Sequence, residues 1–475
     1  MNMKTFSLLT GLLFLYFVCY AQTVTQRIDK AVKVLQSDAQ MKHAQMSLCV
    51  VETKTGKPVY ALNEQVGLAP ASTQKIFTSI AAFELLGKDF KYETEIGYDG
   101  SIRDSILDGS IYIIGYGDPT FGSFRFASTQ SNKIEKDISD AFVRLGIKDI
   151  TGYINFDNTK FSYQPIPVAW IWEDIGNYYG AGSWALNWNE NQFDLKLRPG
   201  KKEGDNVEML DTEPKPGLNN FSNFLKTGKP ESGDNGYIFS SPYSKNAFAT
   251  GTIPAGKKSF TISGSLQSPS DVLKVIIEDI LKKNNITYSG KMGVFFNELK
   301  HPDSDNTFPV ADKIISTFYS PTLDSINYWF LQKSINLYGE ALIKTMAYNN
   351  GSFGSTDEGV KLLKDFWNKN GIEKSALNIM DGSGLSPQNR VTTNALVTAL
   401  QFAKNKSWYS SFYSALPIYN GMHIKSGTIG GAKAYTGYHT SKAGVGYTFA
   451  IIINNYDSEG GSIVPKMFKV LDELK

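Results

Sequence analysis

The stretch Pro70-Ala71-Ser72-Thr73-Gln74-Lys75 is the most informative part of this sequence, because it sets a serine and a lysine three residues apart. The apolar segment that follows ends at Gly87, so residues 72–86 are predicted to form a helix that starts just after the proline. Positions i and i+3 share one face of a helix, which brings the Ser72 hydroxyl and the Lys75 amine together. No other serine in the chain has a lysine three residues later.

The chemistry of this pair sets requirements on the rest of the site. A serine is a weak nucleophile until a base takes its proton. Lysine can be that base only if its pKa falls far below its usual value of about 10.4. A fall of roughly three units needs about 4 kcal/mol from burial or from a nearby positive charge. The pair therefore predicts an enclosed site that holds a second cation.

Two short stretches offer a serine and an asparagine to such a site. Ser325-Ile326-Asn327 lies early in a helix predicted over residues 323–333, and Ser334-Ile335-Asn336 lies between that helix and the next one, residues 337–348. A loop between two helices can point both side chains into a cleft, whereas a helix interior cannot easily do so. We therefore select Ser334 and Asn336, and interpret Ser325 and Asn327 as surface or capping residues.

A lysine followed by a hydroxyl residue and a glycine occurs three times. Lys54-Thr55-Gly56 lies in a predicted hairpin turn, and Lys226-Thr227-Gly228 lies in the polar stretch 201–236, which is predicted to be a long loop. Both are interpreted as exposed turns. Lys425-Ser426-Gly427-Thr428 lies at a predicted strand edge, before the glycines at 430 and 431 that leave room for a ligand. Lys425 is therefore the expected second cation.

These three elements, in this order, resemble the D-alanyl-D-alanine carboxypeptidase/endopeptidase family, the class C low-molecular-mass penicillin-binding proteins. The resemblance extends to residues 110–120, to the aromatic and acidic segment 170–174, and to Asp381-Gly382-Ser383-Gly384-Leu385-Ser386. A long insertion between the first and second elements is also a mark of this family. The resemblance covers nearly all of the chain after residue 21.

The resemblance implies a role for each catalytic candidate. Ser72 would be the acylated nucleophile and Lys75 its base. Ser334 would relay a proton to the leaving amine, Asn336 would hold the substrate amide, and Lys425 would supply the second cation.

The resemblance also implies a substrate-binding segment, Ser426-Gly427-Thr428. The hydroxyls of Ser426 and Thr428 would bind the terminal carboxylate, and the backbone N–H groups of Ser72 and Thr428 would form an oxyanion hole. Asp174 could pair with a cationic group of the cell-wall peptide. An ordinary ion pair inside the inserted region explains Asp174 equally well.

The implied activity is that of a serine DD-peptidase. It would act on peptidoglycan stem peptides through an acyl-enzyme, with β-lactam antibiotics as covalent inhibitors. The balance between carboxypeptidase and endopeptidase activity stays open. The alternatives are a β-lactamase or esterase on the same fold and a non-catalytic wall-binding module.

The order of predicted elements indicates an α+β fold. Strands are expected at 45–51 and 59–62, and three more, at 423–426, 434–440 and 447–454, suggest an antiparallel meander. Residues 22–87 and 311–475 would together form a penicillin-binding, β-lactamase-like catalytic domain, an antiparallel sheet flanked by helices. Residues 88–310 would be inserted as one or two smaller domains.

The first 21 residues predict a cleaved signal peptide, with Lys4 before an apolar run and Cys19-Tyr20-Ala21 as the cleavage site. Lipidation at Cys19 is the alternative. A periplasmic or extracytoplasmic location without a transmembrane anchor follows from this interpretation. Cleavage would leave Cys49 as the one cysteine, which is expected to be buried in a strand and excludes an intrachain disulfide.

The composition of the chain and the spacing of its histidines argue against nucleic-acid-binding and metal-dependent proteins. A net charge of +2 without a block of Lys or Arg gives no indication of a nucleic-acid partner. The four histidines lack ligand spacing, so neither a metal nor another cofactor is expected. The aromatic residues between Trp170 and Trp188 are interpreted as core of the inserted region, with glycan binding as the alternative.

Overall fold

The computed structural model describes residues 22–297 and 310–475. Its central feature is a six-stranded antiparallel sheet in the order β2-β1-β24-β23-β22-β21. Its strands are β1 (Gln45–Glu52), β2 (Pro58–Leu62), β21 (Ile418–Tyr419), β22 (Met422–Ile429), β23 (Ala432–Thr440) and β24 (Gly446–Asn454). The expected meander at the C-terminal end is confirmed by the pairing of β22, β23 and β24.

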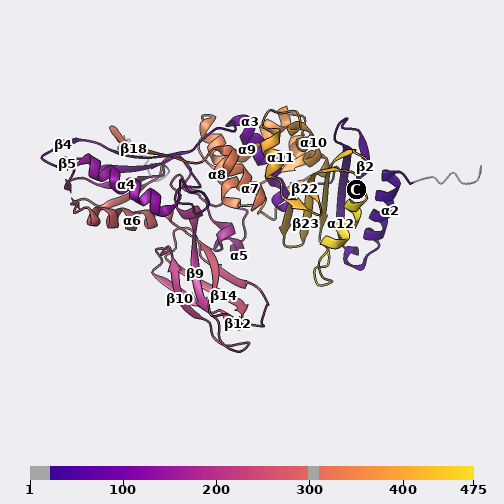
Figure 1. The fold of residues 1–475 in the computed structure, drawn as a ribbon, viewed down its shortest axis with the longest axis horizontal. Helices are drawn as coiled ribbons and strands as arrows, with labels where there is room; N and C mark the ends of the chain where they lie inside the picture. The colour runs from indigo at the N-terminus through magenta and orange to yellow at the C-terminus, as the bar shows by residue number, and fades with distance from the viewer. Residues whose placement is uncertain (1–21, 298–309) are drawn as a thin grey trace, which may run out of the picture.

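This sheet is buried on both faces because its central strands alternate between two cores. In β24, Ala450 and Ile452 face a layer of helices, whereas Ile451 and Ile453 face the opposite side. The opposite side is covered by α2 (Val24–Gln36) and α12 (Val464–Asp472), which Figure 1 shows next to each other.

The helical layer contains the elements that hold the site. It consists of α3 (Lys75–Leu85), α7 (Leu323–Gln332), α8 (Asn336–Asn349), α9 (Thr356–Lys369), α10 (Thr393–Ala403) and α11 (Tyr409–Ala415). Helix α3 is buried at every position from Lys75 to Phe83, and α8 at every position from Asn336 to Ala347. Helices enclosed on all sides need apolar residues around the whole circumference, which the sequence of α3 provides. A short ribbon of β19 (Leu377–Asn378) and β20 (Arg390–Val391) lies beside this layer.

The inserted region begins with a mixed five-stranded sheet in the order β17-β8-β6-β3-β18 and a small sheet in the order β16-β7-β5-β4. Their strands are β3 (Glu93–Tyr98), β4 (Ser101–Arg103), β5 (Ile106–Asp108), β6 (Ile111–Gly115), β7 (Asp149–Ile150), β8 (Ile154–Asp157), β16 (Thr287–Tyr288), β17 (Met292–Phe295) and β18 (Lys313–Tyr319). Helices α4 (Ser131–Leu145) and α6 (Pro269–Lys283) pack in the same core. Because β18 pairs with β3, the chain returns to the helical layer near Ser320 rather than near residue 310.

A second part of the insertion projects from the molecule below α5 (Trp172–Ile175), as Figure 1 shows. It contains the sheet β10-β9-β15 and a sheet in which β11, β12 and β13 all pair with β14. The strands are β9 (Gln192–Arg198), β10 (Glu208–Glu213), β11 (Asn220–Asn223), β12 (Lys226–Gly228), β13 (Asn235–Phe239), β14 (Asn246–Pro254) and β15 (Phe260–Ser265). Both parts of the insertion contribute to one core, through residues such as Ile113 and Leu195.

Three expectations about local structure were wrong. The stretch 201–236 is not a long loop, because it contains β10, β11 and β12 and the start of β13. These strands are short and mostly exposed, so their sequence lacks the apolar alternation that predicts a strand. Thr227 is accordingly a buried strand residue rather than part of an exposed turn. Asn327 is also buried, and its Oδ1 accepts a hydrogen bond of 2.6 Å from the Ser79 hydroxyl, so it is neither a surface nor a capping residue.

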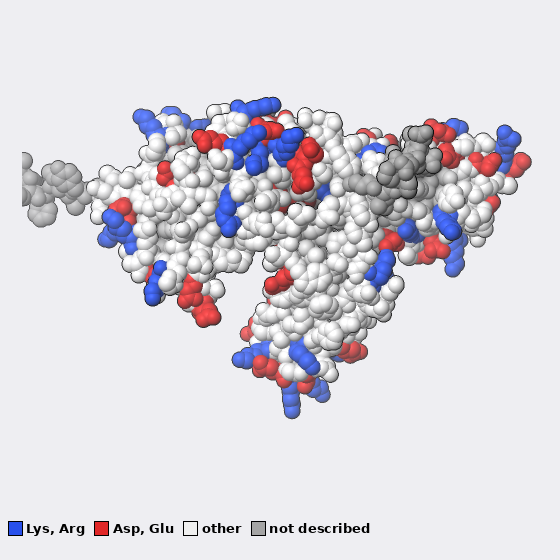
Figure 2. All heavy atoms as spheres, turned by 180° about the vertical axis from the view of Figure 1, so that it is seen from behind, with Lys and Arg blue, Asp and Glu red and all other residues white. Residues whose placement is uncertain are grey.

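Acidic and basic side chains are scattered together over the back of the molecule (Figure 2). Between residues 22 and 297 and from residue 310 onward, the structure has no helix long and apolar enough to cross a bilayer. The expected signal peptide at residues 1–21 lies outside the described residues. Cys49 lies in β1, where it is buried as a free thiol.

Candidate active site

Ser72 lies in a tight turn at the start of α3. Residues Ala71–Gln74 form a 3₁₀ turn, and Ala71 has a φ of 46°, which is unusual for a residue other than glycine. Two glycines let neighbouring backbone approach this turn. A Cβ on Gly384 would lie 2.1 Å from the Ala71 carbonyl oxygen, and one on Gly427 would lie 2.5 Å from that of Pro70. The 381–386 loop and β22 therefore hold the turn from two sides.

Lys75 is the fully buried partner of Ser72. Its Nζ lies 3.0 Å from the Ser72 Oγ and donates hydrogen bonds of 2.7 Å to the Asn336 Oδ1 and to the Ser383 carbonyl. Burial lowers the pKa of Lys75 to about 7, although the carboxylates of Asp381 and Glu340 act in the opposite direction. This is the direction that an amine must take to accept a proton from serine near neutral pH.

Lys425 reaches the site from β22, and Ser334 reaches it from the turn between α7 and α8. The Lys425 Nζ donates to the Ser334 Oγ at 3.0 Å and to the Ser426 carbonyl at 2.9 Å. Burial, followed by the charges of Lys75 and Lys433, lowers the pKa of Lys425 well below its usual value. Since both amines are enclosed and repel each other, we infer that they are not both protonated near neutral pH.

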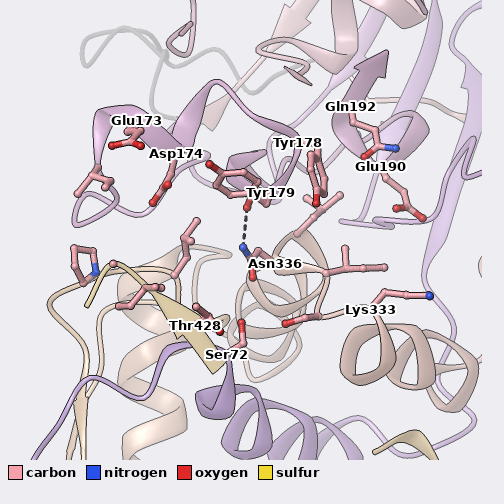
Figure 3. Close-up of a pocket in the computed structure, with 18 of the residues that line it drawn as sticks. Ser72, Glu173, Asp174, Tyr178, Tyr179, Glu190, Gln192, Lys333, Asn336 and Thr428 are labelled. Carbon is pink, nitrogen blue, oxygen red and sulfur yellow. Dashed lines mark hydrogen bonds between the residues drawn. The ribbon is translucent and has the colours of Figure 1, made fainter. Parts of the chain in front are cut away.

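Asn336 is the first residue of α8 and connects the helical layer with the inserted region. Its Oδ1 accepts from Lys75, while its Nδ2 donates a 2.8 Å hydrogen bond to the Tyr179 carbonyl. Figure 3 shows this contact across the cleft, with Ser72 below it. The two hydrogen bonds fix the orientation of the amide before any ligand binds. Ser72, Lys75, Ser334, Asn336 and Lys425 thus form one linked cluster.

The cleft above Ser72 has a volume of about 740 Å³, and its wall comes from both regions of the chain. Thr428 of β22 lines it, and its Oγ1 accepts a hydrogen bond from the Lys433 Nζ at 2.6 Å. Gly427 supports the nucleophile turn, and Ser426 contacts Lys425 through its carbonyl. Of the three residues expected on β22, Thr428 lines the cleft, and Ser426 lies two residues earlier on the same face of the strand.

Asp174 lines the same cleft from α5, next to Glu173 (Figure 3). It is partly buried, and burial followed by the charge of Glu173 raises the pKa of Asp174 to about 6. None of the lysines and arginines that the structure describes forms an ion pair with Asp174. The ordinary ion pair that offered an alternative explanation for this residue is thus absent from the described part of the chain.

Sequence reasoning did not single out a carboxylate network beneath the site. The fully buried Asp381 side chain accepts hydrogen bonds from the Gln74 Nε2 at 2.8 Å, the Gly384 N–H at 2.8 Å and the Trp170 Nε1 at 2.9 Å. Glu340 of α8 accepts from the Gly382 N–H, and burial, followed by the charge of Asp381, raises the pKa of Glu340 to about 8. The network fixes the loop whose Ser383 carbonyl contacts Lys75. The sequence signal that could have revealed this network was Glu340, a glutamate in the middle of an enclosed helix.

Comparisons with known proteins identify relatives of this chain. Residues 28–421 match the model of the D-Ala-D-Ala carboxypeptidase 3 (S13) family. A D-alanyl-D-alanine carboxypeptidase of Actinomadura sp. is 24% identical over 455 residues, which cover 90% of this chain and 80% of that protein. The D-alanyl-D-alanine carboxypeptidase DacB of Haemophilus influenzae is 23% identical, over 83% of this chain and 82% of that protein.

Solved structures show the same fold. The crystal structure of penicillin binding protein 4 (dacB) from Haemophilus influenzae has a TM-score of 0.77 at 21% identity, and the match covers 94% of this chain and 97% of that one. A second structure of that protein, complexed with a β-lactam, gives a TM-score of 0.72. The expected fold class and the family resemblance are thereby confirmed. Because the family model matches most of this chain, the chain belongs to the D-Ala-D-Ala carboxypeptidase 3 (S13) family.

Proposed function

We propose that this protein is a serine DD-peptidase that cleaves the D-alanyl-D-alanine ends or the cross-links of peptidoglycan stem peptides. One observation carries the proposal. The Nζ of a fully buried lysine, Lys75, lies 3.0 Å from the Ser72 Oγ at the base of an open cleft. Membership of the family supports the reaction type.

Acylation begins when neutral Lys75 takes the proton of Ser72, and the Oγ attacks the carbonyl carbon of the penultimate residue. The backbone N–H groups of Ser72 and Thr428 stabilise the negative oxygen that forms. The C–N bond then breaks, and the leaving amine receives, through Ser334, the proton that Lys75 took from Ser72; the Ser334 hydroxyl contacts Lys425. Water later attacks the ester, which releases the shortened peptide and restores Ser72.

Recognition of the substrate is assigned to both walls of the cleft. Thr428 and Ser426 bind the terminal carboxylate, and Asn336 holds the peptide amide. Asp174 binds an amine on the side chain of the residue before the scissile D-alanine pair, since this carboxylate faces the cleft without a described cation as partner. β-Lactams would acylate Ser72 in place of the peptide. A cleaved signal at residues 1–21 would carry the protein to the peptidoglycan.

The direct test is incubation with fluorescent penicillin, followed by peptide mapping and a D-alanine release assay. We expect the label on Ser72, its loss in Ser72→Ala, and release of D-alanine from peptides that end in D-alanyl-D-alanine. A label on Ser383, or labelling that survives in Ser72→Ala, would contradict the assignment of the nucleophile. Rapid release of hydrolysed penicillin without peptide cleavage would identify a β-lactamase instead.

A further inference from the structure

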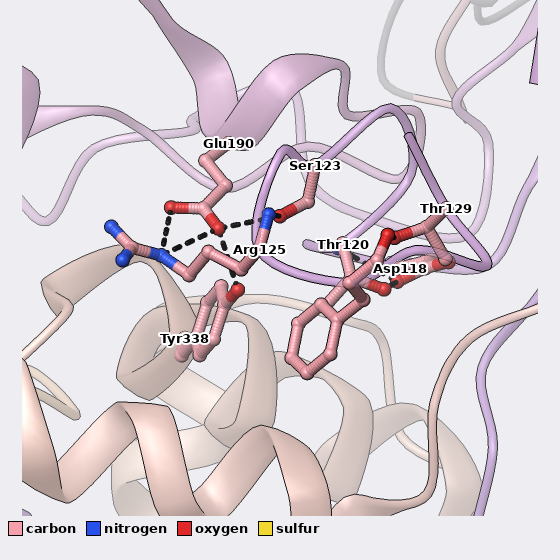
Figure 4. A network of polar contacts seen from close by, with 8 residues as sticks. Asp118, Thr120, Ser123, Arg125, Thr129, Glu190 and Tyr338 are labelled. Atoms are coloured by element: carbon pink, nitrogen blue, oxygen red, sulfur yellow. Dashed lines mark hydrogen bonds and ion pairs between the residues drawn. The ribbon is translucent and has the colours of Figure 1, made fainter. Parts of the chain in front are cut away.

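The wall of the cleft contains an arginine that none of the proposed steps uses. Arg125 lies between β6 and α4, and it lines the same cleft as Ser72 and Asp174. Its Nε donates to the Glu190 carboxylate, with distances of 3.0 Å and 2.9 Å to the two oxygens. Figure 4 shows this contact. Among the described residues, the terminal nitrogens of the guanidinium have no hydrogen-bond acceptor.

Several contacts fix the position of Arg125. Glu190 is almost completely buried, and it also accepts hydrogen bonds from Ser123 at 2.7 Å and from the Tyr338 hydroxyl at 2.8 Å. The guanidinium carbon lies 4.9 Å from the ring centroid of Phe124 and 5.5 Å from that of Trp329. The side chain is therefore pre-organised, which reduces the entropy lost when a ligand binds.

The backbone around Glu190 supports a functional interpretation of this network. Asn189, Glu190 and Asn191 have φ values of 52°, 54° and 51°, so three successive residues other than glycine are left-handed. Asparagine tolerates this region, but glutamate does so at a cost. Such outliers persist where the surrounding structure imposes them, and they concentrate at functional sites. Here the strained residue is the one that positions Arg125.

A second cation lies at the same end of the cleft. Lys333 immediately precedes Ser334, is exposed, and has no ion-pair partner in the described parts of the chain. In Figure 3, Lys333 and Glu190 lie on one side of Ser72, and Glu173 and Asp174 lie on the other. The charges of Arg125, Lys333 and Glu190 sum to one positive charge, whereas Glu173 and Asp174 carry two negative charges when ionised. The cleft is thus polarised along its length.

We propose that Arg125 and Lys333 form an anion subsite for the carboxylate of an acidic residue in the stem peptide, on the N-terminal side of the residue whose amine Asp174 binds. The inference rests on the proposed function. When that amine points to Asp174 and the scissile carbonyl lies at Ser72, the preceding main chain can extend toward Arg125 and Lys333. Guanidinium groups match carboxylates through two parallel hydrogen bonds, and the free terminal nitrogens of Arg125 suit this geometry.

The test uses two peptides that differ in one carboxylate. One is L-alanyl-γ-D-glutamyl-L-lysyl-D-alanyl-D-alanine, and the other carries a carboxamide in place of the glutamyl α-carboxylate. We expect the wild type to cleave the acid with a kcat/KM about five- to tenfold higher than the amide, and this ratio to fall with ionic strength. In Lys333→Glu the ratio should invert. In Arg125→Lys, which keeps a charge beside Glu190, the ratio should fall several-fold.

The control is Lys369→Glu, which makes the same charge change at the exposed end of α9 and should keep the wild-type ratio. A ratio of one in the wild type, or a wild-type ratio in both Lys333→Glu and Arg125→Lys, would overturn the subsite. The second result would identify Arg125 as a purely structural connection between Glu190 and the helical layer. If Arg125→Lys does not fold, the acid-to-amide ratio of Lys333→Glu alone tests the subsite. If the wild type cleaves neither peptide, the proposed function fails rather than the subsite.

Discussion

Ser72 lies at the base of the cleft and Asp174 lies in its wall, and the protein places these two residues by different means. Around Ser72, two buried amines donate to the hydroxyls of Ser72 and Ser334, to the Asn336 amide and to a carbonyl of the 381–386 loop. Around Asp174, acidic residues are carried on a one-turn helix of the insertion and stay partly exposed. The base of the cleft therefore depends on desolvation, whereas the wall depends on charges that a ligand can reach. We expect substitutions at the base to affect every acylating agent and substitutions in the wall to discriminate among peptides.

Among variants that keep Ser72, the largest effect is expected for Lys425→Ala. It removes the group that contacts Ser334 and one of the two amines, so acylation by penicillin and by peptide should both fall by at least about a hundredfold. Lys54→Ala and Lys226→Ala are matched controls, because those lysines lie in a hairpin turn and at an exposed strand position, and neither lines the cleft. The measurement is the second-order acylation rate. A loss of similar size in either control, or none in Lys425→Ala, would refute this map of the base.

The pH dependence of penicillin acylation tests the same region. Burial lowers the pKa of Lys75 to about 7, so the amine is neutral, and able to accept a proton, above that pH. The rate should rise with pH and level off above about 7, and it should drop about tenfold for each unit below the pKa. Because half of the amine is already protonated at pH 7, the expected loss between pH 7 and pH 5 is about fiftyfold. A rate that is flat from pH 5 to pH 9 would show that Lys75 is not the base.

The kind of contact that builds each region determines how much of it could be predicted from the sequence. Ser72 and Lys75 are related by helical spacing, and Ser334 was preferred to Ser325 because it lies between two helices, so local rules sufficed. Two partners of Asp381, Trp170 and Gln74, come from segments more than two hundred residues away, and no local pattern reports such contacts. The strands between 201 and 236 were missed because their short, polar sequences resemble loops. Arg125 and Glu190 meet through a strained turn that has no sequence signature.

A moderate and selective effect is expected for Asp174→Asn. The substitution keeps the size of the side chain but removes the charge, so kcat/KM for peptides with a free side-chain amine should fall about tenfold. Peptides with an apolar side chain at that position, and penicillin itself, are the reference ligands. Because the pKa of Asp174 is raised to about 6, its preference for the amine should be complete above about pH 7 and be lost as the pH falls through 6. Equal losses on all ligands would assign Asp174 a structural role.

The smallest effect is expected for Trp170→Phe, which tests whether the wall and the base are mechanically joined. Trp170 belongs to the insertion, and its Nε1 donates a 2.9 Å hydrogen bond to Asp381, the buried carboxylate beneath the nucleophile. Phenylalanine keeps most of the apolar contact but removes the donor, which should lower the free energy of unfolding by about 1–2 kcal/mol. Because Asp381 fixes the loop that carries the Ser383 carbonyl to Lys75, acylation by penicillin and by peptide should slow together, by a few-fold. Thermal unfolding and the two acylation rates are the measurements.

If peptide cleavage alone slows, Trp170 acts as part of the recognition wall, and the connection through Asp381 contributes nothing to the base. If both rates fall in the same proportion, the insertion also holds the nucleophile's surroundings in place, and the division between the two regions is one of chemistry rather than of structure.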